Sequence, residues 1–162
     1  MFIMEVLRPN YKINKIKSFS LEEDSKGIVI WVLHADKIPP HIGISIDGLF
    51  FSLKLNGKDM AVSIDNMLDI IKRRRIPLIC FSLNNRLLKN EIIASFEKYD
   101  KVIPNGITCL NPIKDILKHE QSNKLVELLF FLEEEGRIIN VCGLNIRNDF
   151  SGIKDYEVHD IH

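Results

Sequence analysis

Net charge is the first thing that this sequence lacks. Lys and Arg together number 22, as do Asp and Glu, so the formal charge at pH 7 is zero. Proteins that bind nucleic acid or anionic membranes through bulk electrostatics carry a basic excess. We therefore expect no nucleic-acid partner. One tight basic cluster, residues 73–75, is expected at a helix C-terminus, where the helix dipole favours positive charge. The alternative is that this cluster contacts a phosphate group or a partner.

Cysteine is also scarce. The chain has three, Cys80, Cys109 and Cys142, and none forms a CxxC pair. An odd, widely spaced set argues against a disulfide scaffold, and the missing CxxC argues against structural zinc. We expect a protein of the reducing cytoplasm whose cysteines form no disulfide and bind no metal.

Long apolar runs and glycine-rich phosphate loops are missing as well. No run reaches the ~18 residues that span a bilayer, and the N-terminal MFIMEVLRPNYK lacks the basic and apolar regions of a signal peptide. Neither GxxxxGK nor GxGxxG occurs. We expect a cytoplasmic protein without a membrane span and without a cofactor.

Residues 39–56 are predicted to form a β-hairpin around which the chain is organised. Asp47-Gly48 suits a two-residue turn in which both residues have positive φ, and strand-like runs flank it. Directly opposed residues share a face. One predicted face is apolar (Ile42, Ile44, Ile46, Leu49, Phe51 and Leu53), and the other is polar (His41, Gly43, Ser45, Phe50, Ser52 and Lys54).

The remaining elements alternate between strands and helices. Buried strands are predicted at 28–34 and 77–83, late strands at 137–142 and 156–161, and an edge strand at 1–7; residues 55–59 read as a turn. Helices are predicted at 64–75, 89–99 and 123–135, with Ser63 and Ser122 as N-caps of the first and last and Gly136 as a stop. A further helix is predicted to start within residues 107–117, capped by Asn111 or by Thr108, and Pro112 favours Asn111. The pattern indicates a single α+β domain over 1–162: a mostly antiparallel central sheet whose hairpin, about 41–54, packs against helices.

Two residues have contexts suited to catalysis. Cys109 lies at or before a predicted helix N-terminus, where the dipole and free N–H groups favour a thiolate. His41 begins a strand on the polar hairpin face beside Gly43, which leaves space for another group. Ser52 or Asn56 could orient its imidazole. Cys80 and Cys142 lie in apolar strands and are expected to be packing residues.

HIGISIDG around His41, followed much later by GITCLNPIKDIL around Cys109, resembles the circularly permuted papain-like proteins of the NlpC/P60 superfamily. The resemblance covers about residues 28–118. It implies Cys109 as nucleophile, His41 as general base and a polar orienting residue on the next strand, where Ser52 is the nearest match and Asn56 the reserve. Two departures are Thr108, where many permuted members have asparagine, and the closeness of Pro112 to the cysteine.

These residues are compatible with two functions. The first is a cysteine hydrolase or acyltransferase that acts on an intracellular amide, isopeptide or ester bond in a peptide, protein or acyl substrate. The second is a non-enzymatic interaction domain, of immunity or adaptor type, whose exposed hairpin edge recruits a partner strand. The sequence does not indicate an oligomeric state.

Overall fold

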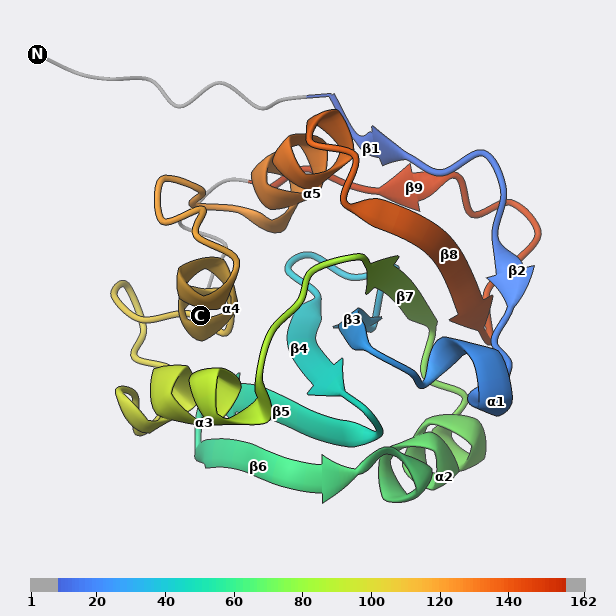
Figure 1. Cartoon of the computed structure of the whole chain (residues 1–162). Coiled ribbons are helices and arrows are strands. Elements are labelled where there is room, and N and C mark those ends of the chain that lie inside the picture. The colour runs from blue at the N-terminus through green and yellow to red at the C-terminus, as the bar shows by residue number, and fades with distance from the viewer. Residues whose placement is uncertain (1–8, 157–162) are drawn as a thin grey trace, which may run out of the picture.

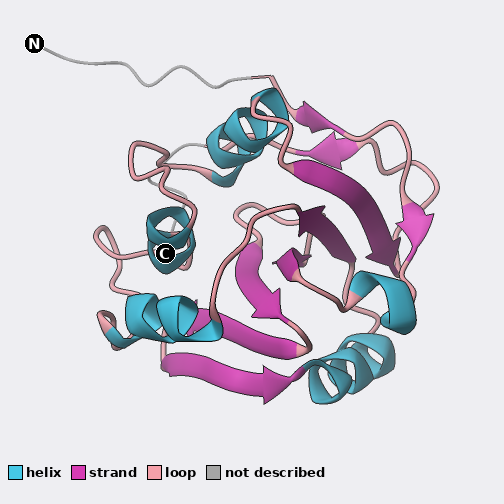
Figure 2. Ribbon diagram, viewed as in Figure 1, coloured by secondary structure: helices cyan, strands magenta, loops and turns pink. Residues whose placement is uncertain are grey.

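The computed structural model describes residues 9–156 as strands and helices arranged around a curved sheet (Figure 1; Figure 2). The strands are β1 (Tyr11–Lys12), β2 (Lys17–Ser18), β3 (Ile28–Leu33), β4 (His41–Ile46), β5 (Leu49–Lys54), β6 (Gly57–Ser63), β7 (Leu78–Leu83), β8 (Ile138–Leu144) and β9 (Gly152–Ile153). The helices are α1 (Leu21–Asp24), α2 (Ile64–Arg74), α3 (Lys89–Glu97), α4 (Asn111–Ile116) and α5 (Leu125–Glu134).

Seven of the strands form the main sheet in the order β2-β8-β7-β3-β4-β5-β6. All neighbours in it are antiparallel except β2 and β8, and β1 pairs separately with β9. The predicted α+β class with a mostly antiparallel sheet is confirmed. None of the helices within residues 9–156 has the length and apolar character needed to cross a bilayer.

The predicted hairpin is confirmed at its turn and through four residue pairs. Asp47 and Gly48 have φ values of 47° and 85°, as a turn of this kind requires. The ladder runs from the pair Ile46–Leu49 to the pair Gly43–Ser52. Asp47 also accepts a hydrogen bond from the Gly27 amide at 3.0 Å, which joins the turn to the start of β3.

Both faces of the hairpin are buried, whereas the sequence predicted one polar face. The apolar face packs into the larger core together with residues of α3, α4 and α5. The other face lies in a second core under α2, where Phe50 packs against Trp31 with ring centroids 5.4 Å apart. Ser45 is tolerated there because its hydroxyl accepts a 2.8 Å hydrogen bond from the Trp31 indole.

The space expected beside Gly43 is already occupied. A Cβ atom at this position would lie 2.4 Å from the Phe50 ring, so Gly43 admits that ring and not a substrate group.

Several element boundaries differ from the sequence predictions. Ser63 caps α2 as expected, but α4 and α5 are preceded by Leu110 and Lys124 in place of Asn111 and Ser122. Residues 57–59, predicted as part of a turn, begin strand β6. The strand predicted at 1–7 lies outside the described residues, as does the one at 156–161 except for Tyr156, which is not in a strand.

Candidate functional site

His41 and Cys109 line one pocket of about 260 Å³ at the end of the hairpin. His41 is the first residue of β4, and Cys109 lies two residues before α4. The rest of the wall comes from the segment before β4, the end of β5, the segment before α4 and the C-terminal part of the described chain (Pro39, Pro40, Ile42, Leu53, Lys54, Leu55, Val102, Thr108, Leu110 and Tyr156). Both predicted catalytic residues therefore line the same pocket. By the alternation of β4, His41 shares the face of Gly43, whereas Cys109 packs against the core that contains Ile42.

Backbone contacts fix the segment that carries Cys109. The Val102 amide donates to the Lys54 carbonyl at 2.8 Å, which attaches this segment to the end of β5. Closer to the cysteine, the Asn111 side chain accepts hydrogen bonds from the amide and hydroxyl of Thr108 at 2.9 and 3.0 Å. Asn111 thus stabilises the turn before the helix, although it is not the N-cap.

The Cys109 sulfur lies against the start of β4. The backbone amides of Ile42 and of Cys109 itself act to lower the pKa of the Cys109 thiol, but burial has the larger effect and raises it. The expectation of a lowered pKa from a helix N-terminus is wrong. Cys109 precedes a helix of only six residues, and its thiol is protonated at neutral pH.

His41 is half-buried, and burial lowers its pKa below the ordinary 6.5. The nearby charge of Asp59 raises the His41 pKa, whereas Lys54 and His34 lower it further. The net result is a neutral imidazole at pH 7. A neutral imidazole can accept a proton from a thiol.

Asp59 is the site residue that the sequence did not reveal. Its carboxylate accepts a 2.7 Å hydrogen bond from the Ser52 hydroxyl and forms a 3.0 Å ion pair with Lys54. Asp59 faces Ser52 across the β5–β6 ladder, and Ser52 faces Gly43 across the β4–β5 ladder. A strand predicted over residues 57–59 would have placed Asp59 opposite Ser52. The composition of Gly57-Lys58-Asp59 is instead typical of a turn, so the sequence did not predict that strand.

The two predicted orienting residues lie in different settings. Ser52 is fully buried and its hydroxyl holds Asp59. Asn56 is exposed in the turn between β5 and β6 and is not among the residues that line the pocket. Neither Ser52 nor Asn56 carries a charge; the negative charge that raises the pKa of His41 belongs to Asp59.

Cys80 and Cys142 lie away from this pocket. They face each other on β7 and β8, and both are fully buried. Burial raises the pKa of Cys80 well above its ordinary value. Both cysteines pack in the second core, as predicted.

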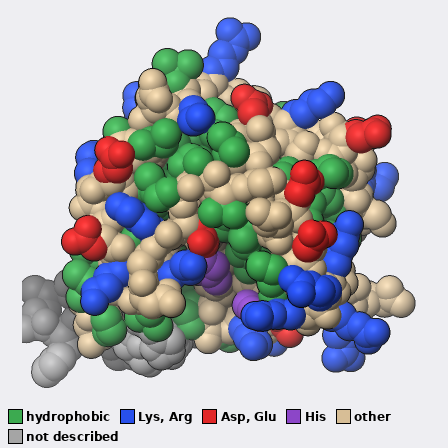
Figure 3. All heavy atoms as spheres, turned by 90° about the horizontal axis from the view of Figure 1, so that it is seen from below, with side chains coloured by type: hydrophobic (Ala, Val, Ile, Leu, Met, Phe, Trp, Pro, Cys, Tyr) green, Lys and Arg blue, Asp and Glu red, His purple; other side chains and the backbone are tan. Residues whose placement is uncertain are grey.

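The surface seen from below has exposed histidine among hydrophobic side chains (Figure 3). Lys and Arg side chains lie on both sides of the histidine side chains. At this end of the sheet, the Ala35 amide donates to the Pro77 carbonyl at 3.2 Å and joins the segment before β4 to the segment after α2.

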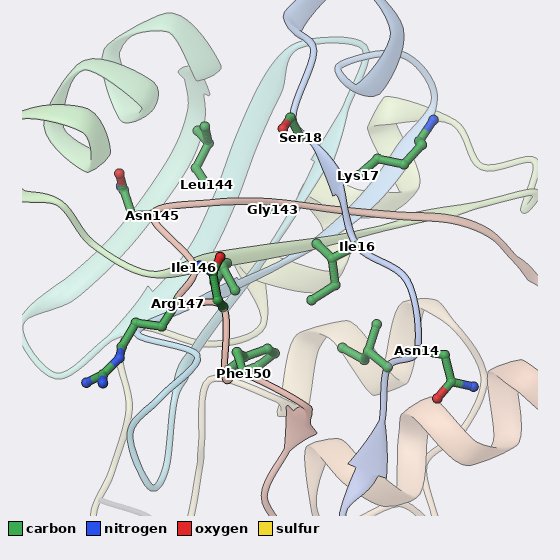
Figure 4. A pocket seen from close by; sticks show the side chains of 12 residues that line it. Asn14, Ile16, Lys17, Ser18, Gly143, Leu144, Asn145, Ile146, Arg147 and Phe150 are labelled. Carbon is green, nitrogen blue, oxygen red and sulfur yellow. The ribbon is translucent and has the colours of Figure 1, made fainter.

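A larger hollow of about 450 Å³ lies between β2 and the segment after β8 (Figure 4). Its polar lining includes Asn14, Lys17, Asn145 and Arg147. It contains neither a cysteine nor a histidine, so it offers no Cys–His pair. Within residues 9–156, no group of three or more His, Cys, Asp or Glu side chains could hold a metal ion.

Comparison of the chain with protein-family models, with curated proteins and with solved structures gives no match. The candidate site is therefore judged on its geometry and chemistry.

Proposed function

We propose that the protein is a cysteine-dependent hydrolase or acyltransferase that acts on an intracellular amide, isopeptide or ester bond. The observation that carries the proposal is that His41 and Cys109 line one pocket. The chain order of a strand-borne histidine and then a cysteine before a helix also supports the circularly permuted papain-like arrangement.

The pKa directions favour general-base catalysis over a preformed ion pair. At pH 7 the Cys109 thiol is protonated and the His41 imidazole is neutral. His41 takes the thiol proton as the sulfur attacks the carbonyl, and nearby backbone N–H groups stabilise the oxyanion. The imidazolium returns this proton to the departing amine or alcohol, and water or an acceptor then releases the acyl group and restores the thiol.

The test measures acylation of Cys109 by p-nitrophenyl acetate, with nitrophenolate release and site-resolved mass spectrometry as readouts. His41→Ala should lower the rate of acylation by about 10²–10⁴-fold, the usual contribution of a general base. The control is His34→Ala, because His34 is also half-buried and near His41 but does not line the pocket.

The pH profile adds a second check. Burial lowers the pKa of His41 below 6.5. The rate of Cys109 acylation should therefore be constant near neutral pH and fall only when the pH is low enough to protonate His41. Acylation of Cys109 at the same rate in wild type and His41→Ala would contradict the proposal.

The second candidate, an interaction domain, is supported by the edge of the sheet. The hairpin cannot offer the expected edge, because β3 pairs with β4 and β6 pairs with β5. Strand β6 ends the sheet and is the edge available to a partner strand. In that case Cys109 would be an unreactive buried thiol.

A further inference from the structure

The wall of the His41–Cys109 pocket is mainly apolar beyond its reactive groups. Leu53, Val102 and Leu110 are at most 5% exposed and form part of this wall, together with Pro40. Such a wall binds hydrocarbon and disfavours any polar group that finds no partner there.

Exposed hydrophobic side chains also occur in and directly beside the lining segments. Large hydrophobic side chains that are exposed within the described residues include Leu55 (58%), Ile38 (49%) and Ile103 (48%). Leu55 lines the pocket, Ile38 directly precedes the lining residue Pro39, and Ile103 directly follows Val102. The hydrogen bond from the Val102 amide to the Lys54 carbonyl holds these two lining segments together.

Fixed charge in the pocket is already compensated. Among the lining residues that the structure describes, Lys54 is the only Lys or Arg. Its ammonium lies 3.0 Å from the Asp59 carboxylate, which neutralises it. A charged substrate group would therefore lose its hydration without gaining an uncompensated partner.

The pocket is also small. Its volume of about 260 Å³ lies just below the ~300–1,000 Å³ that is usual for ligand pockets. The space suits a chain of a few carbons.

From these observations, and resting on the function proposed above, we infer that the site takes a short apolar acyl group, bound as an ester or thioester. The Cys109 sulfur forms a bond to the acyl carbonyl carbon, and the bond to the alcohol or thiol breaks. The leaving group departs with the proton that His41 took from Cys109. Water then cleaves the acyl-enzyme to a short carboxylic acid and the free thiol.

The experiment compares Cys109 acylation by p-nitrophenyl acetate, butyrate, hexanoate and 4-methoxybutanoate. The last ester has as many acyl non-hydrogen atoms as hexanoate but carries an ether oxygen. Rates are divided by those of the same esters with N-acetylcysteine, which removes differences in intrinsic reactivity. The normalised rate should rise by about tenfold or more from acetate to hexanoate and fall again for 4-methoxybutanoate, since each buried methylene contributes severalfold.

A rim variant connects the preference to this pocket. Leu55→Asp should lower the hexanoate rate severalfold and lower the acetate rate by a smaller factor, because the shorter chain buries less apolar surface there. Leu88→Asp is the control, because Leu88 is 68% exposed and lies outside the pocket. The melting temperature of each variant is measured to verify folding.

The outcomes separate the two proposals. Suppose that acetylation of Cys109 depends on His41 but the rate does not rise with acyl chain length. This result contradicts the apolar acyl site and agrees with the proposed cysteine enzyme. Loss of the His41 dependence overturns both proposals.

Discussion

Asp59 shows how one side chain can influence a site through charge alone. Its carboxylate is held by Ser52 and Lys54, and its negative charge raises the pKa of His41 against the larger effect of burial. In the proposed reaction His41 becomes positive as it takes the thiol proton. Asp59 would then stabilise that positive charge and act as a positioning residue.

Asp59→Asn should lower the pKa of His41 further and slow acylation of Cys109. We expect about a tenfold slower rate, which corresponds to ~1.4 kcal/mol of charge interaction. The His41 pKa is measured by NMR titration of the imidazole, and the rate by nitrophenolate release.

The control for this prediction is Asp69→Asn, since Asp69 is exposed on α2. A His41 pKa that stays constant or rises in Asp59→Asn would show that Asp59 does not act on the imidazole.

At the scale of elements, the β4–β5 hairpin shows what the sequence can predict. The Asp47-Gly48 turn and the alternation of apolar residues are local signals, and they determine the register that the structure has. What covers each face is decided by contacts with distant segments. The burial of Ser45 and Phe50 under α2 could therefore not be predicted from the hairpin itself.

The candidate site follows the same division. His41 and Cys109 were recognisable because each sits in a local motif, and the pocket contains both. Asp59 and the burial that raises the pKa of Cys109 depend on segments far apart in the sequence. Those features required the folded chain.

Gly43→Ala tests the close packing of this element. The new Cβ would lie 2.4 Å from the Phe50 ring, which is fully buried against Trp31 and has little freedom to move. Overpacking of this kind costs about 1–3 kcal/mol in the free energy of unfolding, which urea denaturation measures.

Gly106→Ala is the matched control. Its Cβ would meet nothing closer than 3.6 Å, and its free energy of unfolding should stay within about 0.5 kcal/mol of the wild type. Equal stability of the two variants would mean that the ring beside Gly43 can relax.

Across the whole molecule, a buried ion pair connects the C-terminal part of the described chain to α5. Lys124 and Asp155 are 3.1 Å apart, and their side chains are 3% and 2% exposed. Beside them, the Leu125 amide donates to the Tyr156 hydroxyl at 3.1 Å, and Tyr156 lines the candidate pocket. The ion pair thus helps to hold one wall of the pocket.

Lys124→Met should destabilise the protein by about 3–5 kcal/mol, because it leaves the Asp155 carboxylate buried without this cation. The double variant Lys124→Met/Asp155→Leu should recover much of the loss. Urea denaturation measures all three proteins.

The exposed pair Arg147–Asp149 gives the comparison, with side chains 85% and 74% exposed. Arg147→Met should change the free energy of unfolding by less than about 1 kcal/mol. If Lys124→Met had an equally small effect, the Lys124–Asp155 pair would not be a stabilising link.

The main-chain hydrogen bond from Val102 to Lys54 bears on how this protein can diverge. Every residue except proline has an amide hydrogen and a carbonyl oxygen, so this contact, like that of the Ile42 amide with Cys109, places little demand on residue type. Descendants of this chain can exchange the side chains at positions 42, 54 and 102 while Cys109 keeps its position. Distant relatives should therefore share the histidine, the cysteine and the backbone path between them more than the surrounding sequence.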